Sequence, residues 1–255
     1  MPIPLTTLSM RLLAAVAIAG LGAMLTACSD GTDKEAKKTD TTATEVAKST
    51  AVEPVDTIKT AATSANVKLP TAESTVDVAK LMEPGALPDI SIGNPDAKVT
   101  IVEYMSMTCP HCARFHNDIF EAIKTKYVDS GKVKFVLREF PLDNRAAAAI
   151  MLARCAPKEQ YFPMVSALFK SQMTWATAED GRAALLQMSK LAGFTQESFE
   201  ACLTNQKLLD DVNAVRDKAA KEYGVDSTPT FFINGGRYTG EMSIEEMSAL
   251  IDAAE

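Results

Sequence analysis

Apolar and polar positions along the chain fall into blocks that change from strand spacing to helix spacing and back. Residues 98–105 and 133–140 are apolar on both faces, which is typical of central strands in a sheet. Between them, the apolar side chains of residues 115–127 recur at helical spacing, and Gly131 ends the pattern. Strand, helix and strand in this order predict a right-handed βαβ unit with parallel pairing.

A block of helices is predicted after this unit. Pro157, Gly193 and Gly224 separate segments that have helical spacing. The expected helices lie over residues 146–155, 160–171, 178–191, 196–203 and 208–223. The lone tryptophan, Trp175, lies between two of them and is interpreted as a packing residue.

Strand patterns return after Gly224. Residues 230–233 and 237–239 flank Asn234-Gly235-Gly236, which is a strong hairpin signal, and residues 243–246 form a capping box for a last helix. A short edge strand is also expected at residues 89–93. The sequence thus predicts an α/β core in two halves, βαβ and ββα, with helices inserted between them.

The N-terminal region has the composition of an export signal followed by a tether. Arg11 precedes an apolar segment that ends in Leu25-Thr26-Ala27-Cys28, as in a secretory signal peptide of residues 1–27. This ending resembles the lipobox of bacterial lipoproteins, so we expect Cys28 to carry lipid and to attach the chain to a bilayer. The alternative is ordinary cleavage after Ala27, which leaves Cys28 as a free thiol.

Residues 28–86 are expected to form a disordered tether. They are dominated by small, polar and charged residues, contain no aromatic side chain and show weak periodicity. At most, a short amphipathic piece is possible near residues 76–82. We therefore expect the folded part of the chain to begin near Leu87.

Composition narrows the choice of partners and of compartment. The formal net charge of −7 argues against a nucleic-acid partner, and 47% hydrophobic residues in 255 are enough for a proper core. Of the five cysteines, four remain when Cys28 is set aside. An even number suits an exported protein in an oxidising compartment.

The strongest chemical signal is Cys109-Pro110-His111-Cys112, which lies between a strand pattern and a helix pattern. Cys109 at a helix N-terminus would be stabilised as a thiolate by free backbone N–H groups and by the helix dipole. Pro110 suits the first turn, Cys112 is close enough to form a short disulfide, and His111 can add a stabilising donor or positive charge. The spacing therefore favours a redox pair.

A zinc site is the alternative for these residues, because Cys109, Cys112 and His116 have ligand-like spacing. However, there is no second closely spaced cysteine pair, and the chain has only two histidines. The preceding strand also favours redox chemistry, so we expect neither a metal ion nor a cofactor.

Residues 88–254 resemble the DsbA-like branch of the thioredoxin superfamily. The resemblance rests on Glu103 with the Cys109–Cys112 motif, on residues 138–142 (REFPL) and on residues 227–235 (STPTFFING). It implies a thioredoxin-like fold: residues 87–143 form the first half of the core, residues 144–224 a helical insertion and residues 225–255 the second half.

The resemblance also implies roles for particular residues. Cys109 is the exposed nucleophile and Cys112 the buried resolving cysteine. Pro229, preceded by Thr228, is a loop proline with a cis peptide bond that holds an extended substrate. The alternative is a trans turn proline.

Two further assignments combine the residues with the resemblance. Glu103 lies on a strand that is expected to be buried, and we expect it to exchange a proton with Cys112. The alternative is an ordinary Glu that is solvated or paired with Lys98 or Lys134. Cys155 and Cys202 lie on predicted helices and are expected to form a structural disulfide, with two buried thiols as the alternative.

Together these features predict an exported enzyme, lipid-anchored on the periplasmic side of a membrane. It would donate its disulfide to reduced or unfolded exported proteins and be reoxidised by a DsbB-like membrane partner. An isomerase or reductase is the nearest alternative. A metal-binding or chaperone module on the same fold is the alternative from another class.

Overall fold

A computed structural model describes residues 68–255 of the chain. The expected signal peptide, Cys28 and most of the expected tether lie outside these residues. Within residues 68–255, none of the helices combines the length and the apolar character needed to cross a bilayer.

The core is one six-stranded sheet with strand order β1-β6-β5-β3-β4-β2. The central strands β3 and β4 are parallel, and Glu103 of β3 pairs with Leu137 of β4. All other neighbours are antiparallel, so the predicted βαβ and ββα halves meet where β3 pairs with β5. The strands are β1 Ser74–Thr75, β2 Ile90–Gly93, β3 Val99–Met105, β4 Val133–Glu139, β5 Thr230–Ile233 and β6 Gly236–Thr239.

The crossover between β3 and β4 is helical from residue 110 to residue 128, as predicted. It contains α2 (Pro110–Arg114) and α3 (Phe120–Ile123), and a π-helical turn follows each of them. Apolar spacing does not reveal these wider turns, because they shift the helix face by only one residue. Phe115, Ile123 and Tyr127 of this stretch are buried against the sheet.

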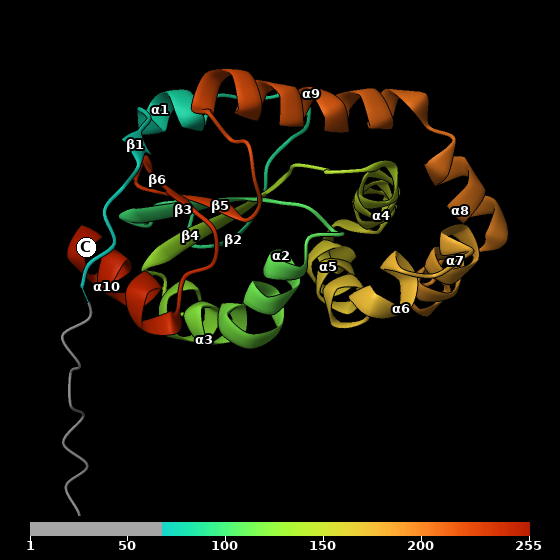
Figure 1. Cartoon of the computed structure of the whole chain (residues 1–255), viewed down its shortest axis with the longest axis horizontal. Coiled ribbons are helices and arrows are strands. Elements are labelled where there is room, and N and C mark those ends of the chain that lie inside the picture. Colours follow the sequence, from blue (N-terminus) through green and yellow to red (C-terminus); the bar gives the residue numbers. More distant parts are fainter. Residues whose placement is uncertain (1–67) are drawn as a thin grey trace, which may run out of the picture. The chain divides into compact units, whose positions relative to one another are not determined.

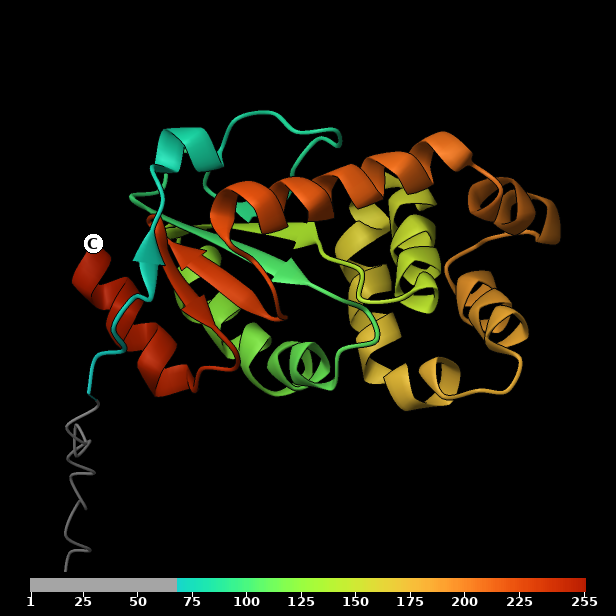
Figure 2. The ribbon, with the colours of Figure 1, turned by 45° about the horizontal axis from the view of Figure 1, so that its top comes forward.

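Helices cover both faces of the sheet (Figures 1 and 2). The crossover helices and α10 (Ile244–Ala254) lie on one face. The long helix α9 (Gln206–Tyr223) runs over the other face, beside α1 (Val78–Leu81). The inserted helices form a separate block beside the sheet: α4 Asn144–Cys155, α5 Tyr161–Lys170, α6 Gln172–Ala176, α7 Gly181–Leu191 and α8 Gln196–Leu203.

The folded part begins earlier than the sequence indicated, because β1 and α1 both precede residue 87. The expectation of a disordered tether extending to residue 86 is therefore wrong for these elements. The Val76 amide donates to the Gly235 carbonyl at 2.8 Å, and Leu81 is buried under α9. The helix α1 lies within the short amphipathic piece that the sequence allowed near residues 76–82, whereas the two residues of β1 have no periodicity to detect.

Candidate active site

Cys109 lies at the N-terminus of α2, directly after β3. It occupies the N-cap position with an extended backbone, and Pro110 is the first helical residue. The Cys109 amide donates to the Ser106 carbonyl at 3.1 Å, and its own carbonyl accepts from Ala113 at 3.1 Å. Both Cys109 and Cys112 are free thiols, so the structure represents the reduced pair.

The two thiols have opposite acidities although they are one helical turn apart. The pKa of Cys109 is lowered to about 5, mainly because the Cys112 thiol donates a hydrogen bond to it. Burial of Cys109 opposes this shift, and the backbone N–H groups of Cys112 and His111 contribute further to the lowering. Cys112 is completely buried, and burial raises its pKa well above the usual value. Its interaction with Cys109 and the nearby charge of Glu103 act in the same direction. A stable thiolate is thus confined to Cys109.

The loop before β5 lies directly against Cys109. The Thr228–Pro229 peptide bond is cis, and the Thr228 carbonyl lies 3.1 Å from the Cys109 sulfur. This close approach leaves Cys109 only 4% exposed, so the expectation of an exposed nucleophile is wrong for this reduced form. The Thr228 side chain also lowers the pKa of Cys109, and its buried hydroxyl has no other partner among the described residues.

His111 belongs to a charged cluster at the mouth of the site. Arg114 forms a bidentate ion pair with Glu241, at 2.7 Å for Nε and 2.9 Å for the second nitrogen. His111 Nδ1 lies 2.7 Å from the guanidinium and 3.2 Å from the carboxylate. Arg114 and Glu241 were missed in the sequence, because they are 127 residues apart and belong to no motif.

Gln172 of α6 fixes the backbone on both sides of the first cysteine. Its buried side-chain amide donates to the Met107 carbonyl at 2.8 Å and to the Cys109 carbonyl at 2.9 Å. The helical insertion therefore holds the loop that carries Cys109. Nothing local to Gln172 in the sequence signals this role.

Glu103 lies on β3, buried behind the cysteine pair as the strand pattern indicates. Its partner is neither solvent nor Lys98 or Lys134, but His116, whose Nε2 lies 3.0 Å from one carboxylate oxygen. The His116 ring is buried and stacks on Phe169, with ring centroids 4.6 Å apart. The other carboxylate oxygen of Glu103 is buried without a partner.

The remaining two cysteines lie in the helical block, away from the redox pair. Cys155 ends α4, Cys202 lies in α8, and a disulfide joins them. The bridge encloses α5, α6 and α7, so it links the two ends of the insertion.

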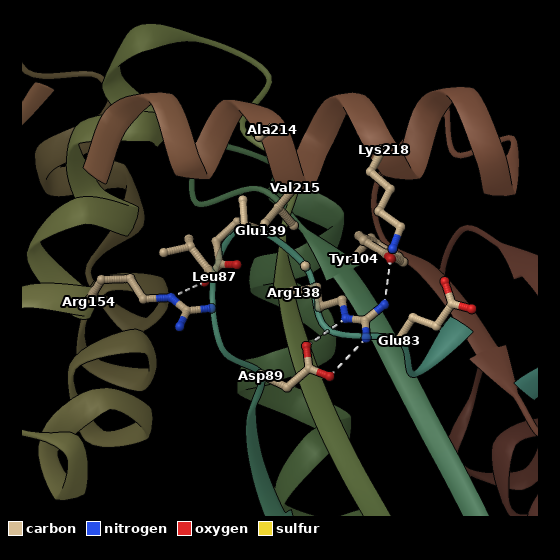
Figure 3. Close-up of a pocket in the computed structure, with 12 residues that line it drawn as sticks. Glu83, Leu87, Asp89, Tyr104, Arg138, Glu139, Arg154, Ala214, Val215 and Lys218 are labelled. Atoms are coloured by element: carbon tan, nitrogen blue, oxygen red, sulfur yellow. Dashed lines mark hydrogen bonds and ion pairs between the residues drawn. The ribbon is translucent and has the colours of Figure 1, made fainter. Parts of the chain in front are cut away.

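A second polar cluster lies beneath α9 and belongs to the scaffold (Figure 3). Arg138 makes two bonds of 2.8 Å to Asp89 and one of 2.9 Å to the Tyr104 hydroxyl. Arg154 pairs with Glu139 at 2.5 Å. The cavity between these side chains, of about 30 Å³, has room for only a water molecule or two. These paired charges account for the Arg138-Glu139 part of the sequence motif.

Comparisons with known proteins agree with this geometry. A family model described as thioredoxin matches residues 86–253. A protein of Rickettsia bellii named "putative protein-disulfide oxidoreductase" is 36% identical over 167 residues. That match covers 65% of this chain and 64% of the Rickettsia protein, so the chain spans less than two thirds of this relative.

Two solved structures have similar folds. Alpha-DsbA1 of Wolbachia pipientis is 33% identical with a TM-score of 0.64, covering 69% of this chain and 94% of that one. A protein-disulfide isomerase of Novosphingobium aromaticivorans is 26% identical with a TM-score of 0.57, covering 66% and 98%. The chain therefore belongs to the thioredoxin family, in its DsbA-like branch of thiol-disulfide oxidoreductases.

Proposed function

We propose that this chain introduces disulfides into other proteins through the Cys109–Cys112 pair. The observation that supports the proposal most strongly is the contrast between the two cysteines. The pKa of Cys109 is lowered to about 5, whereas that of buried Cys112 is raised. A stabilised thiolate favours the reduced enzyme, and a disulfide that gains by reduction is an oxidant.

In the proposed reaction, a substrate thiolate attacks the Cys109 sulfur of the oxidised pair. The Cys109–Cys112 bond breaks, and Cys112 leaves with the electron pair and takes up a proton. A second substrate thiolate then attacks the substrate sulfur of the mixed disulfide, and Cys109 leaves as the stabilised thiolate. The substrate is oxidised by two electrons and the enzyme is reduced by two, so a further oxidant must restore the pair.

Glu103 is the proposed source and acceptor of the Cys112 proton. Because Cys112 is buried, a bare thiolate there would be disfavoured, and water has little access to it. Glu103 is equally buried, and its charge already acts on Cys112. The hydrogen bond from His116 fixes one carboxylate oxygen, so the second remains free for proton exchange.

Thr228 and Pro229 are proposed to hold the substrate. Their loop lies beside the Cys109 sulfur and precedes β5, so an extended peptide could continue the strand-like hydrogen bonding next to the reacting atom. The Thr228 carbonyl lies 3.1 Å from the Cys109 sulfur, which supports this role for the loop. Such main-chain recognition suits substrates that differ in sequence but are unfolded.

The setting is also proposed. The signal-like N-terminus supports export, and the lipobox-like ending supports lipid on Cys28 and a position on the periplasmic side of a membrane. The reoxidant would then be a DsbB-like membrane protein. Mass spectrometry of the mature N-terminus tests this part: a diacylglyceryl group on Cys28 is expected, and an unmodified Cys28 would refute lipid anchoring.

The activity is tested with a reduced, unfolded protein that needs several disulfides. The oxidised enzyme should form disulfides in it, Cys109→Ser should abolish the reaction, and Cys112→Ser should trap a mixed disulfide at Cys109. An enzyme that accelerates insulin reduction, or disulfide rearrangement in a scrambled substrate, but does not oxidise the reduced one would establish the reductase or isomerase alternative instead.

A further inference from the structure

The cluster of His111, Arg114 and Glu241 suggests how the oxidising strength of the site is set. The first two residues lie on the first turns of α2, close behind Cys109. Glu241 reaches them from the segment between β6 and α10. Its carboxylate is the only acidic side chain within ion-pair distance of either residue in the described part of the chain.

Glu241 is held in place by the cis-proline loop. The amide of Gly240, the preceding residue, donates to the Pro229 carbonyl at 2.8 Å. Gly240 has φ of 91°, a backbone conformation that favours glycine, and this turn directs the next residue toward α2. The backbone that carries this carboxylate is therefore hydrogen-bonded to the loop that places Thr228 against Cys109.

His111 has two competing partners. Its Nδ1 can accept a hydrogen bond from Arg114 only while it is unprotonated, and it can donate to Glu241 only when it carries a proton. The other charged groups that act on this cluster are the Cys109 thiolate and Asp118, both of which act on Arg114. Glu241 and the thiolate are thus two anions that both act on the Arg114 guanidinium.

We propose that Glu241 is a positioning residue that limits the oxidising strength of the Cys109–Cys112 disulfide by competing with the Cys109 thiolate for His111 and Arg114. This inference rests on the proposed redox function of the pair. The more strongly Glu241 binds these two side chains, the less they stabilise the thiolate that reduction produces. The disulfide is then harder to reduce, and the enzyme is a milder oxidant.

The sign of the effect follows from the charge that Glu241 places beside Arg114. Arg114 stays charged in the variant, and Glu241 and the Cys109 thiolate both act on it. Removing the negative charge beside Arg114 therefore makes the potential at Cys109 more positive. Since a more positive potential favours the thiolate, the variant should have a lower Cys109 pKa and a more oxidising disulfide.

The experiment is the equilibrium of the pair with reduced and oxidised glutathione for the parent chain and for four variants. Glu241→Gln should favour the reduced enzyme about two- to fivefold, which is ~9–21 mV for a two-electron couple. Arg114→Gln should shift the equilibrium by a similar factor in the opposite direction. The double variant should return close to the parent, because the two charges cancel.

Glu245→Gln is the matched control. It removes the same charge four residues along the chain, from an exposed side chain of α10 that makes no ion pair in the described part of the chain. It should leave the equilibrium unchanged. At about 1 M salt the Glu241→Gln effect should shrink, since exposed charges are then screened within about 3 Å. Melting temperatures of the oxidised variants should stay close together, because surface ion pairs contribute little to stability.

A Glu241→Gln enzyme that is equally or less oxidising than the parent would overturn the inference, as would an equal shift in Glu245→Gln. Either result leaves the proposed function intact. If the parent pair does not equilibrate with glutathione at all, the proposed function itself fails, and the two failures are thereby distinguished.

Discussion

The low pKa of Cys109 predicts that the stability of the reduced protein depends on pH in a way that the oxidised protein does not share. The folded-state pKa is about 5, whereas the ordinary value is 9.0. Because the folded value is depressed, the thiolate contributes its full stabilisation above pH 9. That contribution falls with decreasing pH and is lost as the pH passes through 5.

The magnitude follows from the size of the shift. Each unit between the folded and unfolded values is worth ~1.36 kcal/mol, and pH 7 lies two units above the folded value, so the thiolate contributes about 3 kcal/mol there. Cys112 adds no slope in this range, because its pKa is raised and its effect begins only above pH 9. Carboxylates away from the cysteine pair titrate alike in both redox forms and cancel in the difference.

The assay is denaturant unfolding of the reduced and of the oxidised chain at several pH values from 4 to 8. The stability of the reduced form minus that of the oxidised form should rise by about 3 kcal/mol between pH 4 and pH 7. Thiolate absorbance in the ultraviolet should titrate with a midpoint near 5. His111→Ala should raise this midpoint, since it removes a stabilising group beside the thiolate.

Cys109→Ser is the control for this experiment, because it keeps the fold and removes the titrating group. Its stability difference between pH 4 and pH 7 should match that of the oxidised protein. A midpoint near 9 in the parent, with a flat difference between the two redox forms, would refute the account of Cys109.

Three further outcomes are expected. Replacing Cys155 and Cys202 together by Ser opens a loop that spans 47 residues, so the chain should unfold at a lower temperature and lose up to about 4 kcal/mol of unfolding free energy. Thiol oxidation should continue, and an unchanged unfolding temperature would refute a stabilising role. Glu103→Gln keeps the shape but not the exchangeable proton, and stopped-flow measurement should find resolution of mixed disulfides slowed at least about tenfold; an unchanged rate would exclude Glu103 from the proton transfer. Gln172→Leu leaves two buried carbonyls without their donor, so the free energy of unfolding, measured by chemical denaturation, should fall by about 1–3 kcal/mol. Gln172→Glu should restore part of this free energy at low pH, where its carboxyl group is protonated and can donate.

Local patterns in the sequence were sufficient for most of the fold. The strand Thr230–Ile233 and the helix Gln196–Leu203 have the predicted bounds, and the capping box of Ser243 and Glu246 forms as expected. Each depends on spacing or on turn chemistry within a few residues. The edge strand β2 and the parallel pair β3–β4 were predicted for the same reason.

Contacts between distant segments could not be predicted in this way. His116 was considered only as a possible metal ligand, yet it pairs with Glu103 because the crossover helix packs directly over β3. Glu241 and Gln172 reach the site from the segment after β6 and from α6, and no property of their own neighbours indicates where those segments lie. The start of the fold at β1 was missed because two residues form no pattern.

The reduction potential of the Cys109–Cys112 pair tests the central proposal most directly. The pair is equilibrated with glutathione buffers at pH 7, the reaction is quenched, and the fraction of reduced enzyme is counted by alkylation and mass. A disulfide donor should have a potential above about −180 mV, because the Cys109 thiolate favours reduction. A potential near about −270 mV, as in thioredoxin-type reductants, would contradict the proposal that this chain introduces disulfides.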